Sequence, residues 1–85
     1  MDEVAKLVQA LTLKSMETQV SMDYTELRAM QAQRLIAQTI IALGGEPPVC
    51  VEAWDRHIQR AQEELDESRR MLAHMESVAA EAGGQ

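Results

Sequence analysis

Two histidines are the residues of this chain that most often bind metals, and their spacing argues against a metal site. His57 and His74 lie 17 residues apart. Metal sites in helical bundles use Glu-x-x-His or His-x-x-x-His, because ligands three or four residues apart share one face of a helix. Neither histidine has a carboxylate, a cysteine or another histidine at that spacing, and Glu-x-x-His does not occur in the chain. We therefore expect no metal and no cofactor, and a bundle that binds a metal or a small ligand is only a third hypothesis.

Cys50 is the single cysteine and the one candidate for a thiol nucleophile. Thiol catalysis needs a base oriented toward the sulfur, but no histidine lies near Cys50 in the sequence, and its charged neighbours Glu46 and Glu52 are acidic. The pair Gly44-Gly45 precedes two prolines and lacks the lysine of a phosphate-binding loop. The sequence therefore predicts a protein that is not an enzyme. Cys50 is expected to be a reduced thiol, and the alternative is a disulfide between two copies in an oxidising compartment.

The charge of the chain is negative and unevenly distributed. The formal net charge is −6, and the basic residues of the first half are spread along the sequence. Nucleic acids and anionic membranes both attract clustered Lys and Arg, so we expect neither as a partner. Residues 46–85 hold nine acidic and four basic side chains, a net charge of −5. A partner protein with a basic surface would be attracted to this half.

The N-terminus and the apolar runs predict a cytoplasmic location. Asp2 and Glu3 stand where a signal peptide would carry basic residues. The most apolar run, residues 35–43, has nine residues, whereas a bilayer-spanning helix needs about 20.

One group of helix-breaking residues divides the chain. Gly44-Gly45-Glu46-Pro47-Pro48 separates two long stretches that contain neither glycine nor proline and are rich in helix-forming residues. We therefore expect an all-α antiparallel hairpin, with one helix at about 2–43, a turn at 44–50 and a second helix at about 51–81. We expect residues 1–82 to form a single domain and residues 83–85 to form a disordered tail. Gly44 is placed to end the first helix in the left-handed conformation.

The second predicted helix carries an unbroken seven-residue repeat. Its core positions alternate three and four residues apart, the pattern of a helix that packs along another helix, and Ser68 is the only polar residue among them. Arg60–Glu64 and Asp66–Arg70 are four residues apart, so both pairs are expected to meet on the surface. The core positions are Val51, Trp54, Ile58, Ala61, Leu65, Ser68, Leu72, Met75 and Ala79.

The first predicted helix has two apolar faces. Because each residue turns a helix by about 100°, the two sets of positions point in nearly opposite directions, and one partner helix covers only one of them. The first stripe consists of Leu13, Met16, Val20, Leu27, Met30, Ala37 and Ile41, with Asp23 and Arg34 as polar gaps. The second stripe consists of Val4, Val8, Leu11, Met22, Ala29, Ala32, Ile36 and Leu43, with Ser15, Thr18, Thr25 and Thr39 completing its repeat.

The unequal lengths of the two helices leave a choice between two architectures. Folded back from residue 43, the second helix reaches only to residue 13 or 14, so about a dozen apolar-rich residues project beyond it. In the favoured architecture, the hairpin self-associates, as a homodimer or higher oligomer, into a four-helix bundle or a coiled-coil-like assembly. In the alternative, the first helix breaks near residues 21–23 and the chain forms a three-helix bundle, since Asp23 and Glu26 resemble a capping box.

These patterns predict a protein–protein interaction module that works as a small homo-oligomeric adaptor or regulatory protein. The alternative is a small acidic inhibitor, of the kind found on mobile elements, that blocks a regulator or an enzyme. Tyr24 is expected either at the rim of the hairpin core or in contact with a partner, and Trp54 either packs over Pro47 or Pro48 or anchors an interface. The predicted oligomer interface is Val4, Val8, Leu11, Met22, Ala29, Ala32 and Ile36, and the predicted partner-binding residues are Tyr24, Trp54, Glu63, Glu64, Asp66 and Glu67.

Overall fold

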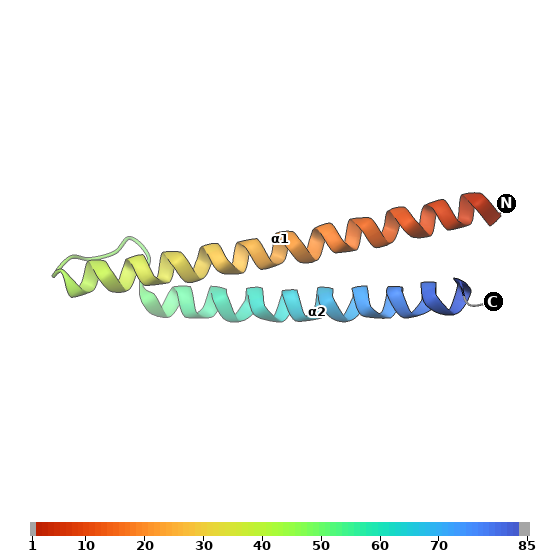
Figure 1. Ribbon diagram of the computed structural model, residues 1–85. Coiled ribbons are helices and arrows are strands. Elements are labelled where there is room, and N and C mark those ends of the chain that lie inside the picture. The colour runs from red at the N-terminus through yellow and green to blue at the C-terminus, as the bar shows by residue number, and fades with distance from the viewer. Residues whose placement is uncertain (1, 84–85) are drawn as a thin grey trace.

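The protein is a two-helix antiparallel hairpin, as the sequence predicts. The computed structural model describes residues 2–83, in which α1 (Asp2–Ala42) and α2 (Val51–Gly83) are the only helices and no strand occurs. The two helices lie side by side with both chain ends at the same end of the molecule (Figure 1). Helix α2 continues to Gly83, two residues beyond the expected end, and the rest of the predicted tail lies outside the described residues.

Helix α1 is continuous through residues 21–23, so the three-helix alternative is wrong. No glycine or proline is available there to reverse the chain. Asp23 also does not act as a helix cap. Its carboxylate accepts one hydrogen bond from the Gln19 amide, at 2.8 Å, and another from the Ser68 hydroxyl of α2, also at 2.8 Å.

The turn begins with a Schellman motif at the end of α1. The Gly45 amide donates to the Ile40 carbonyl and the Gly44 amide donates to the Ile41 carbonyl, both at 2.9 Å. Gly44 has a φ of 85°, the left-handed conformation that the sequence predicts for it. At Gly45, a Cβ atom would lie 2.9 Å from Cγ2 of Ile40, so this glycine allows the close approach of the turn to α1.

The core of the hairpin lies along the predicted repeat of α2. All nine of its predicted core positions are buried or half-buried. Leu65, with 1% of its surface exposed, packs with Leu27 and Ala61, and three half-buried side chains surround this cluster. These three are Val20, Met30 and Ile58.

The first stripe of α1 forms the other half of the core, with one exception. Ile41 is exposed, and Ile40 is half-buried in its place. The repeat fails here because α2 begins only at Val51 and the returning turn, not α2, covers the end of α1. Ile40 packs under that turn, close to Gly45 and to a small cleft that it shares with Pro47.

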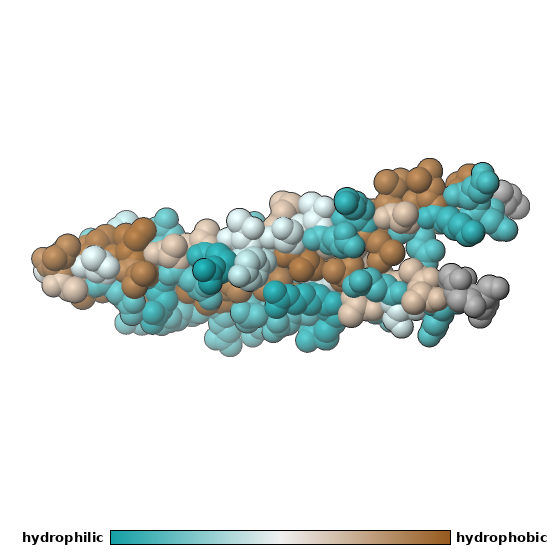
Figure 2. Space-filling model, viewed as in Figure 1, coloured by the Kyte–Doolittle hydropathy of each residue, from teal (hydrophilic) through white to brown (hydrophobic). Residues whose placement is uncertain are grey.

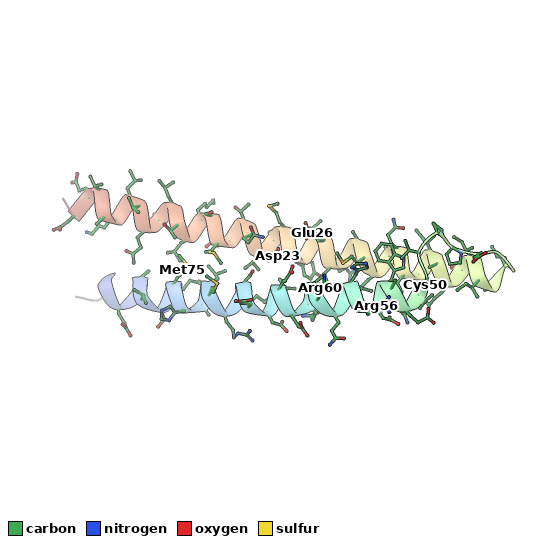
Figure 3. All side chains as sticks on the ribbon, turned by 180° about the vertical axis from the view of Figure 1, so that it is seen from behind. Asp23, Glu26, Cys50, Arg56, Arg60 and Met75 are labelled. Atoms are coloured by element: carbon green, nitrogen blue, oxygen red, sulfur yellow. The ribbon has the colours of Figure 1, made fainter. Side chains whose placement is uncertain are left out.

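Each polar gap in the two repeats has a polar partner on the other helix. Ser68, the polar residue of the α2 repeat, donates its hydroxyl to Asp23, which lies on the side of α1 that faces α2 (Figure 3). Arg34, the second gap in the first stripe, forms an ion pair with Asp55. In the part of the chain that the structure describes, this is the only ion pair.

The overhang of α1 is shorter than the sequence predicts. With Ser68 opposite Asp23, counting fifteen residues further along both helices places Gly83 opposite about residue 8. The turn folds back beside α1 (Figure 1), so α2 starts alongside the last turns of α1 rather than beyond them. The apolar side chains near the N-terminus are nevertheless exposed, including Val4 at 65% and Leu7 at 60%.

Candidate interaction surface

The second stripe of α1 is exposed along its whole length. All twelve of its positions face solvent, and none carries a charge. Leu11 is 61% exposed and Ile36 is 51% exposed, values that are high for large apolar side chains. Figure 2 shows apolar surface over both ends of α1, whereas much of α2 is hydrophilic. Helix α2 therefore covers one face of α1 and leaves the other face without a partner in the monomer.

The threonines of the second stripe have their hydroxyl groups satisfied within α1. Thr18 donates to the Lys14 carbonyl at 3.0 Å, and Thr25 and Thr39 donate to the carbonyls four residues before them at 2.9 Å. A buried hydroxyl without a hydrogen-bond partner is costly, but these three already have one. The stripe can therefore be covered by an apolar surface without leaving these donors unpaired.

Two alanines leave the backbone of α1 close to the surface on this face. Ala29 and Ala32 are both exposed and lie between Thr25 and Ile36 on the second stripe. Small side chains allow the axis of another helix to approach closely. This part of α1 therefore offers a shallow contact between two regions of larger apolar side chains.

Further exposed apolar residues border the second stripe but do not belong to its repeat. Leu7 and Leu35 are both at least 60% exposed. They are four heptads apart and each directly precedes a second-stripe position, Val8 or Ile36. Both residues occupy the same position of the heptad repeat in α1, on one flank of the stripe. The sequence therefore already indicated an apolar flank here.

The two aromatic side chains lie in different environments. Tyr24 is 47% exposed, so the expectation of a half-buried position at the rim of the core is wrong. The repeat that contacts α2 passes through Asp23 and Leu27 and leaves Tyr24 outside it. Its role as a partner contact stays a prediction.

Trp54 is half-buried at the turn, where the sequence predicts it. With Pro47 and Pro48 it lines a cleft of about 100 Å³ at the closed end of the hairpin. Its ring lies edge-on to His57, with 6.0 Å between the ring centres. Trp54 therefore closes the hairpin core, and its role as an interface anchor is a separate prediction.

The acidic residues of α2 do not form the surface ion pairs that their spacing predicts. Glu63, Glu64 and Glu67 are exposed. Asp66 is half-buried and accepts a hydrogen bond from the Gln62 amide at 3.1 Å, not from Arg70. Within residues 2–83, no ion pair therefore neutralises the negative charge of these four side chains.

The candidates for chemistry lie apart from one another. Cys50 is exposed at the start of α2, where its carbonyl accepts the Trp54 amide at 3.2 Å (Figure 3). Within residues 2–83, no three His, Cys, Asp or Glu side chains are grouped so that they could hold a metal ion. Neither described helix combines the length and the apolar character that crossing a membrane requires.

Two open clefts flank α1 near the free end of the hairpin. The first, of about 350 Å³, lies between the helices and is lined by Leu13, Met75 and Val78 among others. The second, of about 320 Å³, lies on α1 alone and includes Val8 and Leu11 of the second stripe. Both clefts are open to solvent.

Comparison of the chain with protein-family models, with curated proteins and with solved structures finds no match in any of the three.

Proposed function

We propose that this protein is a non-enzymatic protein–protein interaction module, a small adaptor or regulatory protein that forms a homo-oligomer. The observation that carries this proposal is the second stripe, eleven exposed and uncharged positions on one face of α1 that Leu43 continues into the turn. Monomeric proteins rarely leave so long an apolar surface open to water, and such surfaces are commonly interfaces. The hairpin supplies the scaffold, because α2 packs against the opposite face of α1 and leaves this face free.

A charge in the middle of the second stripe tests the proposal. Ala32→Glu leaves the hairpin core intact, because Ala32 is exposed and faces away from α2. Burying an unpaired carboxylate in an interface costs about 3 kcal/mol or more, which weakens association by more than roughly 100-fold. Light scattering of the wild-type protein is expected to give at least about 19 kDa, twice the 9.5 kDa of one chain, and the variant is expected to approach 9.5 kDa.

Gln31→Glu is the matched control for this experiment. It adds the same charge at the neighbouring residue, which is exposed but points about 100° away from Ala32. We expect this control to keep the wild-type mass. If Ala32→Glu also keeps the wild-type mass and thermal stability, the second stripe is not the interface.

A second candidate function is supported by the acidic surface of α2. Glu63, Glu64 and Glu67 are exposed, and no ion pair within residues 2–83 neutralises them. A chain that uses this surface to block a basic partner would bind more weakly as salt is raised. Apolar self-association through the second stripe would change little between 0.05 M and 0.5 M salt. Binding to a basic partner protein that weakens between these two concentrations would therefore support this second function, and binding that does not weaken would contradict it.

A further inference from the structure

We propose that the second stripe of α1 binds the same stripe on a second copy of this chain, antiparallel and along the full length of α1. This inference rests on the proposed function. It adds the direction and the extent of the contact between the two copies and the residues that face each other across the interface.

The heptad spacing of the second stripe and its lack of charged residues define the kind of surface that can bind it. Positions of the second stripe alternate four and three residues apart from Val4 to Leu43, the spacing of a helix that packs along another helix. A complementary surface must be an uncharged helix face about 60 Å long. Helix α1 of a second copy meets both requirements. The outward side of α2, with Glu63, Glu67 and Arg70, does not.

The exposed surface of the monomer is large enough for such an interface. The chain exposes 6582 Å², whereas a folded monomer of 9.5 kDa exposes about 5,000 Å². The excess of roughly 1,500 Å² exceeds the approximately 800 Å² that each partner contributes to a standard interface. The excess is therefore large enough to supply one standard interface with a second copy.

The sizes of the side chains favour the antiparallel direction. Large apolar residues lie at both ends of the second stripe, and small ones lie at similar distances on either side of its centre. A twofold axis across the middle of α1 places each end of the stripe against the opposite end of the second copy. The facing pairs are Val4–Leu43, Val8–Thr39, Leu11–Ile36, Ser15–Ala32, Thr18–Ala29 and Met22–Thr25, and the two residue numbers of each pair add to 47.

A parallel arrangement matches the sizes less well. It places Ala29 against Ala29 and Ala32 against Ala32, two shallow layers directly beside a bulky layer of two Ile36 side chains. In the antiparallel arrangement each of these alanines faces Thr18 or Ser15, which fill more of the space. Uniform packing along a helix pair favours the second case.

The flanks of the antiparallel arrangement bring no like charges together. In the same alignment, residues on the two flanks of the stripe meet diagonally, in pairs whose numbers add to 49 on one flank and to 45 on the other. Lys14 thus lies near Leu35, and its aliphatic stem can cover that exposed side chain. Arg28 lies across from Ser21, and Glu26 lies across from Gln19. The alignment therefore has no electrostatic penalty at the edges of the stripe.

Cross-linking tests the direction and the alignment. In a Cys50→Ser background, two single-cysteine variants, Leu11→Cys and Ile36→Cys, are prepared separately and treated with a short bis-maleimide reagent. Both positions are exposed in the monomer, so the hairpin core is unaffected. In the proposed dimer the two copies of either cysteine lie about 37 Å apart, whereas Leu11→Cys of one copy faces Ile36→Cys of the other.

We expect covalent dimer from an equal mixture of the two variants and none from either variant alone. Cross-linking of each variant with itself would show a parallel dimer, which overturns this inference and leaves self-association intact. A wild-type mass of 9.5 kDa by light scattering at every concentration would overturn both self-association and this inference. Arg70→Cys, on the exposed side of α2, is the control for cross-linking by random collision. If this control cross-links as strongly as the mixture, that result also counts against the inference.

Discussion

Gly44 holds the conformation that lets the chain leave α1 and return. Its φ of 85° lies in the left-handed region, and no atom lies within 4 Å of the place where a Cβ would stand. The cost of a side chain there is therefore one of backbone strain, not of a clash. The same turn brings Gly45 against Ile40 and sets where α2 begins.

Gly44→Ala is expected to destabilise the hairpin by about 1–2 kcal/mol, the cost of the left-handed conformation for a residue with a Cβ. Gly44→Asn is expected to cost less, because asparagine adopts this conformation more readily. Urea denaturation followed by circular dichroism measures both. Equal stability of Gly44→Ala and the wild type would mean that the turn has another conformation in solution.

The heptad repeats predict some of these residue positions and not others. Gly44 was predictable because a glycine after a long helix and before prolines has few other roles. The exchange of Ile41 for Ile40 in the core was not predictable, because it depends on how far the turn folds back. Tyr24 was placed near the core from its distance to Val20 and Leu27, although the heptad positions that contact α2 exclude it.

At the scale of the helices, one polar contact within the interface, Asp23–Ser68, and one exposed ion pair, Arg34–Asp55, join α1 to α2. Asp23 and Ser68 were recognisable in the sequence as interruptions of the two repeats. Their pairing was not, because the partner of Asp23 depends on the alignment that the turn produces. Polar groups inside a helix interface fix alignment at some cost in stability, and Asp23–Ser68 is placed to do this here.

A double-mutant cycle tests the contact between Asp23 and Ser68. Ser68→Ala is expected to destabilise the hairpin by about 0.5–1.5 kcal/mol, since Asp23 loses a donor while half-buried. The double variant Asp23→Leu with Ser68→Ala is expected to be at least as stable as the wild type, because apolar side chains then fill both positions. Denaturation curves of the four proteins give the coupling energy, and a coupling near zero would contradict the contact.

At the scale of the whole molecule, the hairpin is long and thin. It measures 64 × 16 × 13 Å and has a radius of gyration of 19.0 Å, whereas a compact chain of this length has about 12 Å. In the described part of the chain, the buried apolar residues are Leu27, Ala37, Ala61 and Leu65. So small a core gives a single copy little stability.

The melting temperature is therefore expected to depend on protein concentration, because self-association stabilises the folded chain by mass action. A tenfold increase in concentration should raise it by roughly 3–5 °C for a domain of this size. Circular dichroism at three concentrations measures this effect. Ala32→Glu serves as the control and should melt at a lower, constant temperature, while a constant value for the wild type would indicate a stable monomer.

The sequence was most informative about the faces of the helices and least informative about what lies against them. The two stripes of α1 follow from periodicity, so the exposed face was predictable down to its twelve positions. The length of the overhang was not, because it depends on the path of eight residues between Ala42 and Val51. The occupant of the second stripe depends on surfaces outside a single chain, which periodicity does not describe.

The antiparallel arrangement of the helices also predicts the order in which the contacts between them form. Contacts beside the turn join residues close in sequence, such as Ile40 and Pro47, whereas the open cleft at the other end joins residues as distant as Leu13 and Val78. The entropy lost on closing a loop grows with its length, so we expect the earliest contacts to form at the turn. We then expect the helices to pair progressively toward the ends of the hairpin, and thermal opening to start at those ends and to run back toward Trp54.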